Sequence, residues 1–140
     1  MEELWLYWAE CEQMAAEKLN LLYQARGFLP SSTGIGFLLA ELEEEQGNCV
    51  QAHTILKNLA ALSPSTTGLR RLQLEQRRGS SVEELSTVYQ EVCSNISEVK
   101  EASEVALGFS DMMIVKSDLQ AAINTLDSAI TARVGYILNN

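Results

Sequence analysis

The stretch Leu42-Glu43-Glu44-Glu45-Gln46-Gly47-Asn48 recurs further along the chain as Leu74-Glu75-Gln76-Arg77-Arg78-Gly79-Ser80, at a shift of 32 in the numbering. A shift of 70 also places Ser117-Asp118-Leu119-Gln120-Ala121-Ala122 on Gly47-Asn48-Cys49-Val50-Gln51-Ala52. The repeating unit is therefore about 32 to 38 residues long, which is the length typical of repeats built from two helices.

Within each unit the apolar residues are spaced as on two short helices. In the second unit an i, i+3, i+4, i+7 pattern occurs on both sides of Gly47. Its members are Ile35, Leu38, Leu39 and Leu42, followed by Ala52, Ile55, Leu56 and Leu59. Glycine readily adopts the left-handed conformation that ends a helix, so Gly47 and Gly79 predict helix ends. Either Ser80 with Glu83 or Ser81 with Glu84 predicts a capping box at the start of the next helix.

The pattern predicts an all-α fold, namely an α-solenoid of antiparallel helix pairs with about four repeats in one domain over 1–140. A single pair cannot cover its own apolar stripe, whereas stacked pairs bury a continuous one. The approximate repeats are 1–30, 31–64, 65–96 and 97–131, with 132–140 as the start of a truncated further repeat. The connectors 30–34 and 63–68 contain helix breakers and are predicted to be turns. We expect a segment of a longer array, or an isoform without its capping repeats.

Composition and charge exclude several functional classes. Leu, Ala, Glu and Gln supply 58 of the 140 residues, which favours helix over strand. The net charge of −9 opposes general nucleic-acid binding. Three widely spaced cysteines predict reduced, mostly buried thiols. Because there is no basic leader and no apolar stretch of about 20 residues, we expect neither secretion nor a membrane span, which leaves nucleus or cytoplasm.

No residue pattern points to catalysis, a cofactor or a metal. His53 is the only histidine, and no nucleophile or carboxylate lies at an obvious catalytic spacing from it. The carboxylates of Glu41, Glu43, Glu44 and Glu45 point in different directions on a helix, so a solvated face is predicted, with an acidic patch for a basic tail as the alternative. The chain is therefore predicted not to be an enzyme.

Two groups of residues are candidates for a partner interface. The first contains Arg70, Arg71, Arg77 and Arg78, four of the chain's ten positive residues. This cluster permits three interpretations: intrahelical pairing, with Arg71 beside Glu75, binding of a partner protein, or direct RNA contact. The absence of interleaved aromatic stacking platforms disfavours RNA.

The second group is Trp5 and Trp8, in a helix whose aromatic residues, with Tyr7, point in different directions. Any of these side chains left exposed would be an anchor for a preceding repeat or another subunit.

Several of these segments resemble the half-a-TPR (HAT) repeat family of RNA-processing scaffolds. Trp5–Ala9 and Leu22–Arg26 resemble the two helices of a HAT repeat. Glu43–Asn48 with Gln51–Lys57, and then Leu69–Gly79, resemble consecutive repeats of the pre-mRNA-processing factor 39 family. The likeness covers roughly residues 4 to 130 and is strongest between Phe37 and Tyr89.

The resemblance implies a nuclear, non-enzymatic scaffold of the U1 small nuclear ribonucleoprotein (U1 snRNP). Such a scaffold helps to commit the 5′ splice site through protein contacts, and related proteins form dimers through HAT repeats. Two alternatives stay open. One is a HAT scaffold of pre-mRNA 3′-end processing, and the other is a TPR-like adaptor that captures an acidic or C-terminal peptide.

Overall fold

The computed structural model describes residues 1–116 and 118–139, and these residues form helices and no strand. Ser117, part of the third copy of the repeated stretch, and Asn140, in the segment assigned to a further repeat, lie outside the described residues. The all-α prediction is confirmed. The chain divides into two compact units, Met1–Ser63 and Pro64–Asn140. This division falls next to the predicted boundary between the second and third repeats.

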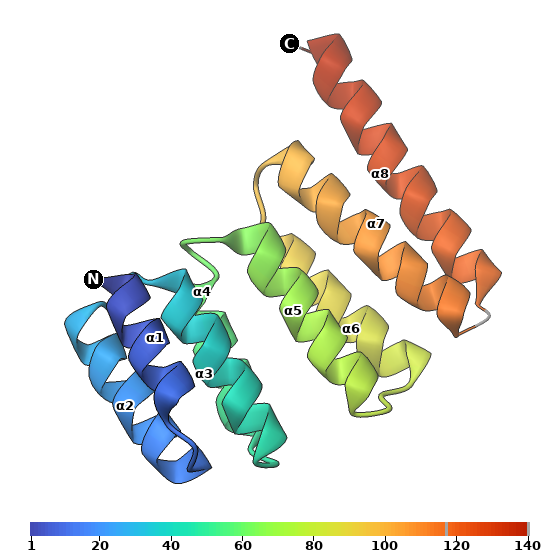
Figure 1. Cartoon of the computed structure of the whole chain (residues 1–140). Coiled ribbons are helices and arrows are strands. Elements are labelled where there is room, and N and C mark those ends of the chain that lie inside the picture. Colours follow the sequence, from blue (N-terminus) through green and yellow to red (C-terminus); the bar gives the residue numbers. More distant parts are fainter. Residues whose placement is uncertain (117, 140) are drawn as a thin grey trace. The chain divides into compact units, whose positions relative to one another are not determined.

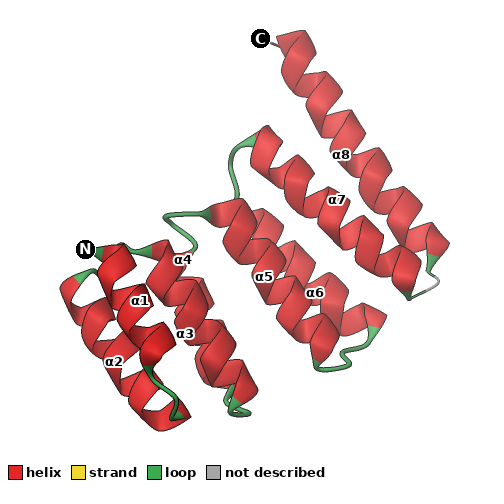
Figure 2. Cartoon of the chain, in the orientation of Figure 1, coloured by secondary structure: helices red, strands yellow, loops and turns green. Residues whose placement is uncertain are grey.

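The first unit contains α1 (Glu2–Cys11), α2 (Ala15–Phe28), α3 (Thr33–Glu45) and α4 (Cys49–Leu59). Helices α1 and α2 form one pair and α3 and α4 another, and α3 contacts both members of the first pair (Figures 1 and 2). Large side chains such as Leu22, Ile35 and Ile55 are fully buried between them. Gly36 lies directly against the Leu59 side chain, so the lack of a Cβ allows α3 and α4 to approach closely.

The second unit contains α5 (Pro64–Arg77), α6 (Val82–Ser94), α7 (Val99–Val115) and α8 (Leu119–Asn139). Helix α7 contacts α5, α6 and α8, so it lies at the centre of the unit's packing. One buried cluster joins Leu72 of α5, Leu85 and Val92 of α6, and Val105 and Phe109 of α7. The apolar stripes of these helices therefore form a common core.

The helix ends follow the repeated stretch. Gly47 has a φ of 84° and Gly79 a φ of 80°, which confirms the predicted left-handed helix ends. After each glycine, the next amide donates back into the helix: Asn48 to the Glu43 carbonyl at 2.8 Å, and Ser80 to the Glu75 carbonyl at 3.2 Å. Both ends are thus Schellman motifs with the same register in the repeat.

Only one of the two possible capping boxes is used at the start of α6. The Ser81 hydroxyl accepts a hydrogen bond from the Glu84 amide at 3.2 Å. Ser80 instead donates its hydroxyl to the Glu75 carboxylate, which fixes it to the end of α5. Ser81 is therefore the N-cap of α6, which is one of the two predicted alternatives.

Three predicted boundaries are wrong. The sequence pattern places residues 30–34 and 63–68 in turns, but α3 already begins at Thr33 and α5 at Pro64. Proline is well tolerated at the first helical position, because the amide hydrogen that it lacks would have no partner there. At the other end, 132–139 continue α8 instead of starting a new helix after a turn. The only breaker in this stretch is Gly135, whose cost inside a helix is about 1 kcal/mol and is too small to end it.

Candidate protein-interaction surfaces

Glu43 is a buried structural carboxylate rather than part of a solvated acidic face, which corrects the sequence prediction for this residue. Its exposed fraction is 6 %. It accepts hydrogen bonds from the Asn48 side-chain amide and from the Tyr23 hydroxyl of α2, both at 2.8 Å. The Tyr23 oxygen also accepts from Gln51 of α4 at 3.2 Å. This network ties α2, α3 and α4 together, and burial raises the pKa of Tyr23.

Glu75 occupies the equivalent position in the next copy of the repeated stretch. It is 9 % exposed and accepts from the Ser80 hydroxyl at 2.5 Å. Its other oxygen accepts from Arg78 at 3.0 Å. In both copies, a buried glutamate binds the residue that follows the helix-ending glycine. We call this arrangement the glutamate–glycine helix end, comprising Glu43, Gly47 and Asn48 in one copy and Glu75, Gly79 and Ser80 in the other.

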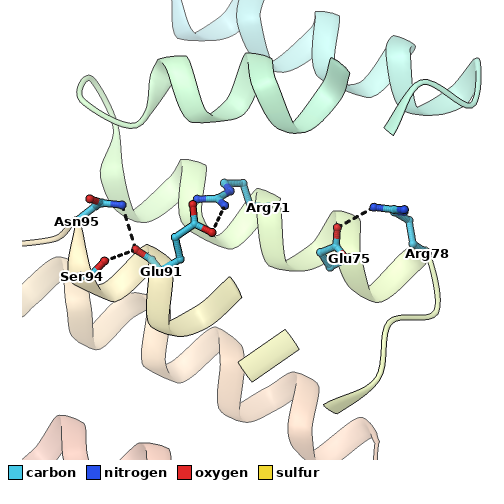
Figure 3. Close-up of polar contacts among 6 residues, drawn as sticks. All are labelled: Arg71, Glu75, Arg78, Glu91, Ser94 and Asn95. Atoms are coloured by element: carbon cyan, nitrogen blue, oxygen red, sulfur yellow. Dashed lines mark hydrogen bonds and ion pairs between the residues drawn. The ribbon is translucent and has the colours of Figure 1, made fainter. Parts of the chain in front are cut away.

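The structure divides the arginine cluster instead of assembling it on one surface. Arg71 is 5 % exposed and pairs with Glu91 of α6 at 3.1 Å, a pair that the sequence pattern does not predict. Figure 3 shows Arg71 directed toward α6 and Arg78 directed along α5 toward Glu75. The pairing of Arg71 therefore supports the packing of α5 on α6, and this residue is not available to a partner.

Of the two remaining arginines, Arg77 is exposed and Arg70 is half-buried. Each of them makes a further polar or electrostatic interaction within the chain. The Glu91 carbonyl, at the end of α6, accepts from Ser94 at 2.8 Å and from Asn95 at 3.0 Å (Figure 3). The cluster thus contains one buried cation, Arg71, and three that are at least partly exposed: Arg78, which pairs with Glu75, and Arg70 and Arg77.

Trp5 and Trp8 lie together in an aromatic stack, so the expectation that they point in different directions is wrong: residues three positions apart are neighbours on the surface of a helix. Their ring centroids are 5.6 Å apart with an interplanar angle of 22°. Phe28, at the end of α2, also stacks on Trp5, with the ring centroids 5.7 Å apart. Trp8 is 50 % exposed and Phe28 is also exposed. Sequence reasoning missed Phe28, because antiparallel pairing of α1 with α2 is needed to bring it beside Trp5.

A cavity of about 520 Å³ adjoins this stack, lined by Phe28, Glu2 and the 29–32 turn. The Glu2 carboxylate accepts from the Ser32 hydroxyl at 2.6 Å and so joins α1 to the start of α3. Aromatic side chains that are partly exposed and rigidly stacked are suited to bind a partner, since they lose little conformational entropy on contact. The stack is therefore the strongest candidate contact of the first unit.

The second unit contains a half-buried tyrosine–cysteine pair, Tyr89 and Cys93. Because Cys11 is exposed and Cys49 is half-buried as well, the prediction of mostly buried thiols is wrong. The Tyr89 ring stacks on Phe109 with centroids 4.2 Å apart, and its hydroxyl donates to the Cys93 sulfur. Burial raises the pKa of both side chains above their ordinary values. A thiol held protonated in this way is a poor nucleophile, so the geometry fits packing.

Metal-binding clusters are not found among the described residues. No group of three or more His, Cys, Asp and Glu side chains there is placed to hold a metal ion. Within the same residues, no helix is sufficiently long and apolar to traverse a bilayer. Comparison with protein-family models and with curated protein sequences gives no match for the chain.

Proposed function

We propose that the chain is a HAT-repeat scaffold of pre-mRNA splicing, most similar to pre-mRNA-processing factor 39, that binds proteins of the U1 snRNP in the nucleus. In this role it has no enzymatic activity and needs no cofactor. It acts by holding partners in fixed relative positions, because stacked helix pairs are rigid and binding to them loses little conformational entropy. Partner proteins, including a second copy of the chain, bind along the helix surfaces.

The observation that carries this proposal is the glutamate–glycine helix end, which occurs twice, at the same register in two successive copies of the repeated stretch. In both copies the buried carboxylate, the left-handed glycine and the following polar residue make equivalent contacts. Equivalent contacts at a fixed spacing support a true structural repeat, and not a chance likeness of sequence. The residues concerned are those in which the resemblance to HAT repeats is strongest.

The helix contacts within each unit support a solenoid of such repeats. In the first unit α3 packs on both α1 and α2, and in the second unit α7 packs on both α5 and α6. Within each unit, the first helix of the second pair therefore contacts both helices of the first pair, which is the kind of stacking expected of a solenoid. In this proposal the pairs α1–α2, α3–α4, α5–α6 and α7–α8 are four repeats of one solenoid.

The charge distribution supports protein partners over RNA. With a net charge of −9, the chain as a whole repels phosphate. Arg71 and Arg78, half of the only dense basic cluster, are engaged in internal pairs. The stack of Trp5, Trp8 and Phe28 and the accessible pair Arg70 and Arg77 are the surfaces that we assign to partner contacts.

Affinity isolation from nuclear extract tests the proposal. The full chain is immobilised, and recovered U1 and U2 snRNAs are quantified together with U1-specific proteins. We expect U1 components to be enriched at least tenfold over U2. Digestion of exposed RNA before elution should leave the U1 proteins bound, because the contacts are with protein. Equal recovery of U1 and U2, or recovery of 3′-end-processing factors, chaperones or receptor tails in place of U1, would contradict the proposal.

A further inference from the structure

Helices α7 and α8 form an apolar groove of about 270 Å³ on the second unit. Leu107 of α7 and Leu126, Ile130 and Val134 of α8 supply its large side chains. Leu107 is 58 % exposed and Ile130 is 59 % exposed. Of the residues that line the groove, Arg133 alone carries a charge. Apolar side chains of this size left half in solvent are typical of a surface that binds another element.

The repeat shows what occupies the same groove one helix pair earlier. The Ser80 amide donates to the Glu75 carbonyl at the end of α5, and the Asp118 amide donates to the Met113 carbonyl at the end of α7. These two helix ends are therefore equivalent, with Asp118 in the place of Ser80. Asp118 and Ser80 are 38 positions apart, and at the same shift the groove residues correspond to four residues of the preceding pair. Leu107, Leu126, Ile130 and Val134 take the places of Leu69, Val88, Val92 and Ile96.

In the preceding pair, all four equivalent residues pack into the core to which α7 contributes. Val92 belongs to the same buried cluster as Val105 and Phe109 of α7, and Leu69, Val88 and Ile96 pack against that cluster. Gly108 of α7 lies directly on the Leu69 side chain. Thus the groove between α5 and α6 is filled by an amphipathic helix, and the groove between α7 and α8 has similar apolar residues at the same register.

Helix α7 also defines the helix that such a groove accepts. Val105 and Phe109 lie four residues apart on its buried face, and Gly108 allows its backbone to approach a leucine. The Phe109 ring, four positions after Val105, stacks on Tyr89 of α6. A matching helix therefore carries an aliphatic residue, a glycine three positions later and an aromatic residue at the next position.

We propose that the groove between α7 and α8 binds, in trans, an amphipathic helix of a partner protein with this Val-x-x-Gly-Phe pattern. The groove lies one repeat further along the chain than the interface that α7 forms with α5 and α6, and it has similar apolar residues at the same register. Arg133 at its edge favours a partner helix with an acidic side chain beside the apolar stripe. The binding mode is that of a helix in a hydrophobic groove. It follows from the repeat geometry alone and does not depend on a role in splicing.

The test uses the full chain and a fluorescent peptide with the sequence of α7, Val99–Val115, measured by fluorescence anisotropy. We expect saturable binding at micromolar concentration. Leu107→Asp and Ile130→Asp should each weaken binding at least tenfold, because both place a charge in the groove. Both side chains are more than half exposed in the chain, so the variants should keep the far-ultraviolet circular dichroism of the parent.

Matched controls separate groove binding from non-specific adhesion. Val115→Asp places the same charge on an exposed apolar residue outside the groove and should change the affinity less than twofold. A peptide that carries Phe109→Asp should not bind. The peptide could instead displace α7 of the chain from α5 and α6, and then Leu107→Asp and Ile130→Asp would leave the affinity unchanged. That result would overturn the proposal.

Two further outcomes would also overturn it. The first is an absence of peptide binding at concentrations up to 1 mM, on the order of the weakest useful affinity. The second is concentration-dependent self-association in sedimentation that Ile130→Asp abolishes, with the peptide failing to compete. In that case the occupant is a second copy of the chain and not a partner helix.

Discussion

The buried glutamates Glu43 and Glu75 show how one side chain can fix a helix end. Each accepts two side-chain hydrogen bonds, and one of the two donors follows the helix-ending glycine. Hydrogen bonds to a charged group are stronger than neutral ones, and a buried donor left without its partner is costly. We therefore expect these carboxylates to stabilise the repeat more than any exposed acidic residue.

Glu75→Gln tests this expectation. The substitution keeps the side-chain volume but replaces one acceptor oxygen by an amide that faces the Ser80 and Arg78 donors. The free energy of unfolding should fall by about 1–3 kcal/mol, measured by urea denaturation. Glu45→Gln, the same change at an exposed position, should alter it by less than about 0.5 kcal/mol. Equal effects of the two substitutions would contradict a structural role for Glu75.

The tyrosine–cysteine pair predicts a loss of stability at alkaline pH. Burial raises the pKa of Cys93 above 9.0 and that of Tyr89 above 10.0, so the folded state retains protons that the unfolded state releases. Their contribution to stability is fully present below the ordinary pKa values of 9.0 and 10.0, and it is lost as the pH rises above these values toward the raised pKa values of the folded state. The double variant Tyr89→Phe, Cys93→Ala should show a shallower decline in unfolding free energy above pH 9. A decline as steep as that of the parent would disprove this assignment.

The sequence did not predict that the charged side chains of Glu43 and Arg71 are buried. Glu43 stands in a run of acidic residues, and such runs are usually solvated, so the run concealed its role. The available signal was its register in the repeat, four residues before Gly47, as Glu75 is before Gly79. The ion pair of Arg71 was not predictable because its partner, Glu91, lies on another helix, and sequence spacing reveals only pairs within one helix.

At the scale of the helix, the positions of glycine decide where elements end. Gly47 and Gly79 have positive φ and end their helices, whereas Gly135 lies inside α8 with open space around it. These ends were predictable because glycine in the left-handed conformation has a direct physical cause. The continuation of α8 past residue 131 was also predictable, because no strong helix breaker follows this residue; the expectation of a truncated further repeat concealed this signal.

Two alanine substitutions should have opposite effects on stability for this reason. Gly79→Ala forces a side chain into the left-handed region and should destabilise the chain by about 1 kcal/mol. Gly135→Ala removes backbone freedom from the unfolded chain within a helix and should stabilise it by about 0.5–1 kcal/mol. Thermal or urea unfolding measures both. Effects of the same sign would show that one of the two helix assignments is wrong.

At the scale of the whole molecule, the repeat determines both the fold class and the proposed function. The helical-pair length of the repeating unit and the helix-favouring composition were sufficient to predict paired helices. They were insufficient to identify surfaces, because the contacts of Trp5 with Phe28 and of Arg71 with Glu91 depend on how helices pair in space. Prediction of a partner surface therefore requires the packing as well as the pattern.

The accessible arginines supply a test of partner binding that leaves the fold unchanged. Arg70→Glu combined with Arg77→Glu reverses two charges on α5 and should preserve helicity. We expect at least tenfold weaker binding to purified U1 snRNP, because the partner surface loses two cationic contacts. Glu104→Lys with Asp111→Lys, a double charge reversal on exposed residues of α7 that are seven positions apart like the two arginines, is the matched control and should leave binding within threefold. Unchanged binding by the arginine variant would remove these residues from the interface.

The most direct measurement of the proposed scaffold function compares the affinity of the chain for intact U1 snRNP with its affinity for a U1 protein subcomplex that contains no RNA. Both are titrated against the immobilised full chain at the same salt concentration. If the chain is a scaffold that binds through protein contacts, the two dissociation constants should agree within threefold, and naked U1 snRNA should not bind. Binding to the RNA-containing particle and to naked U1 snRNA, without binding to the protein subcomplex, would contradict the central claim.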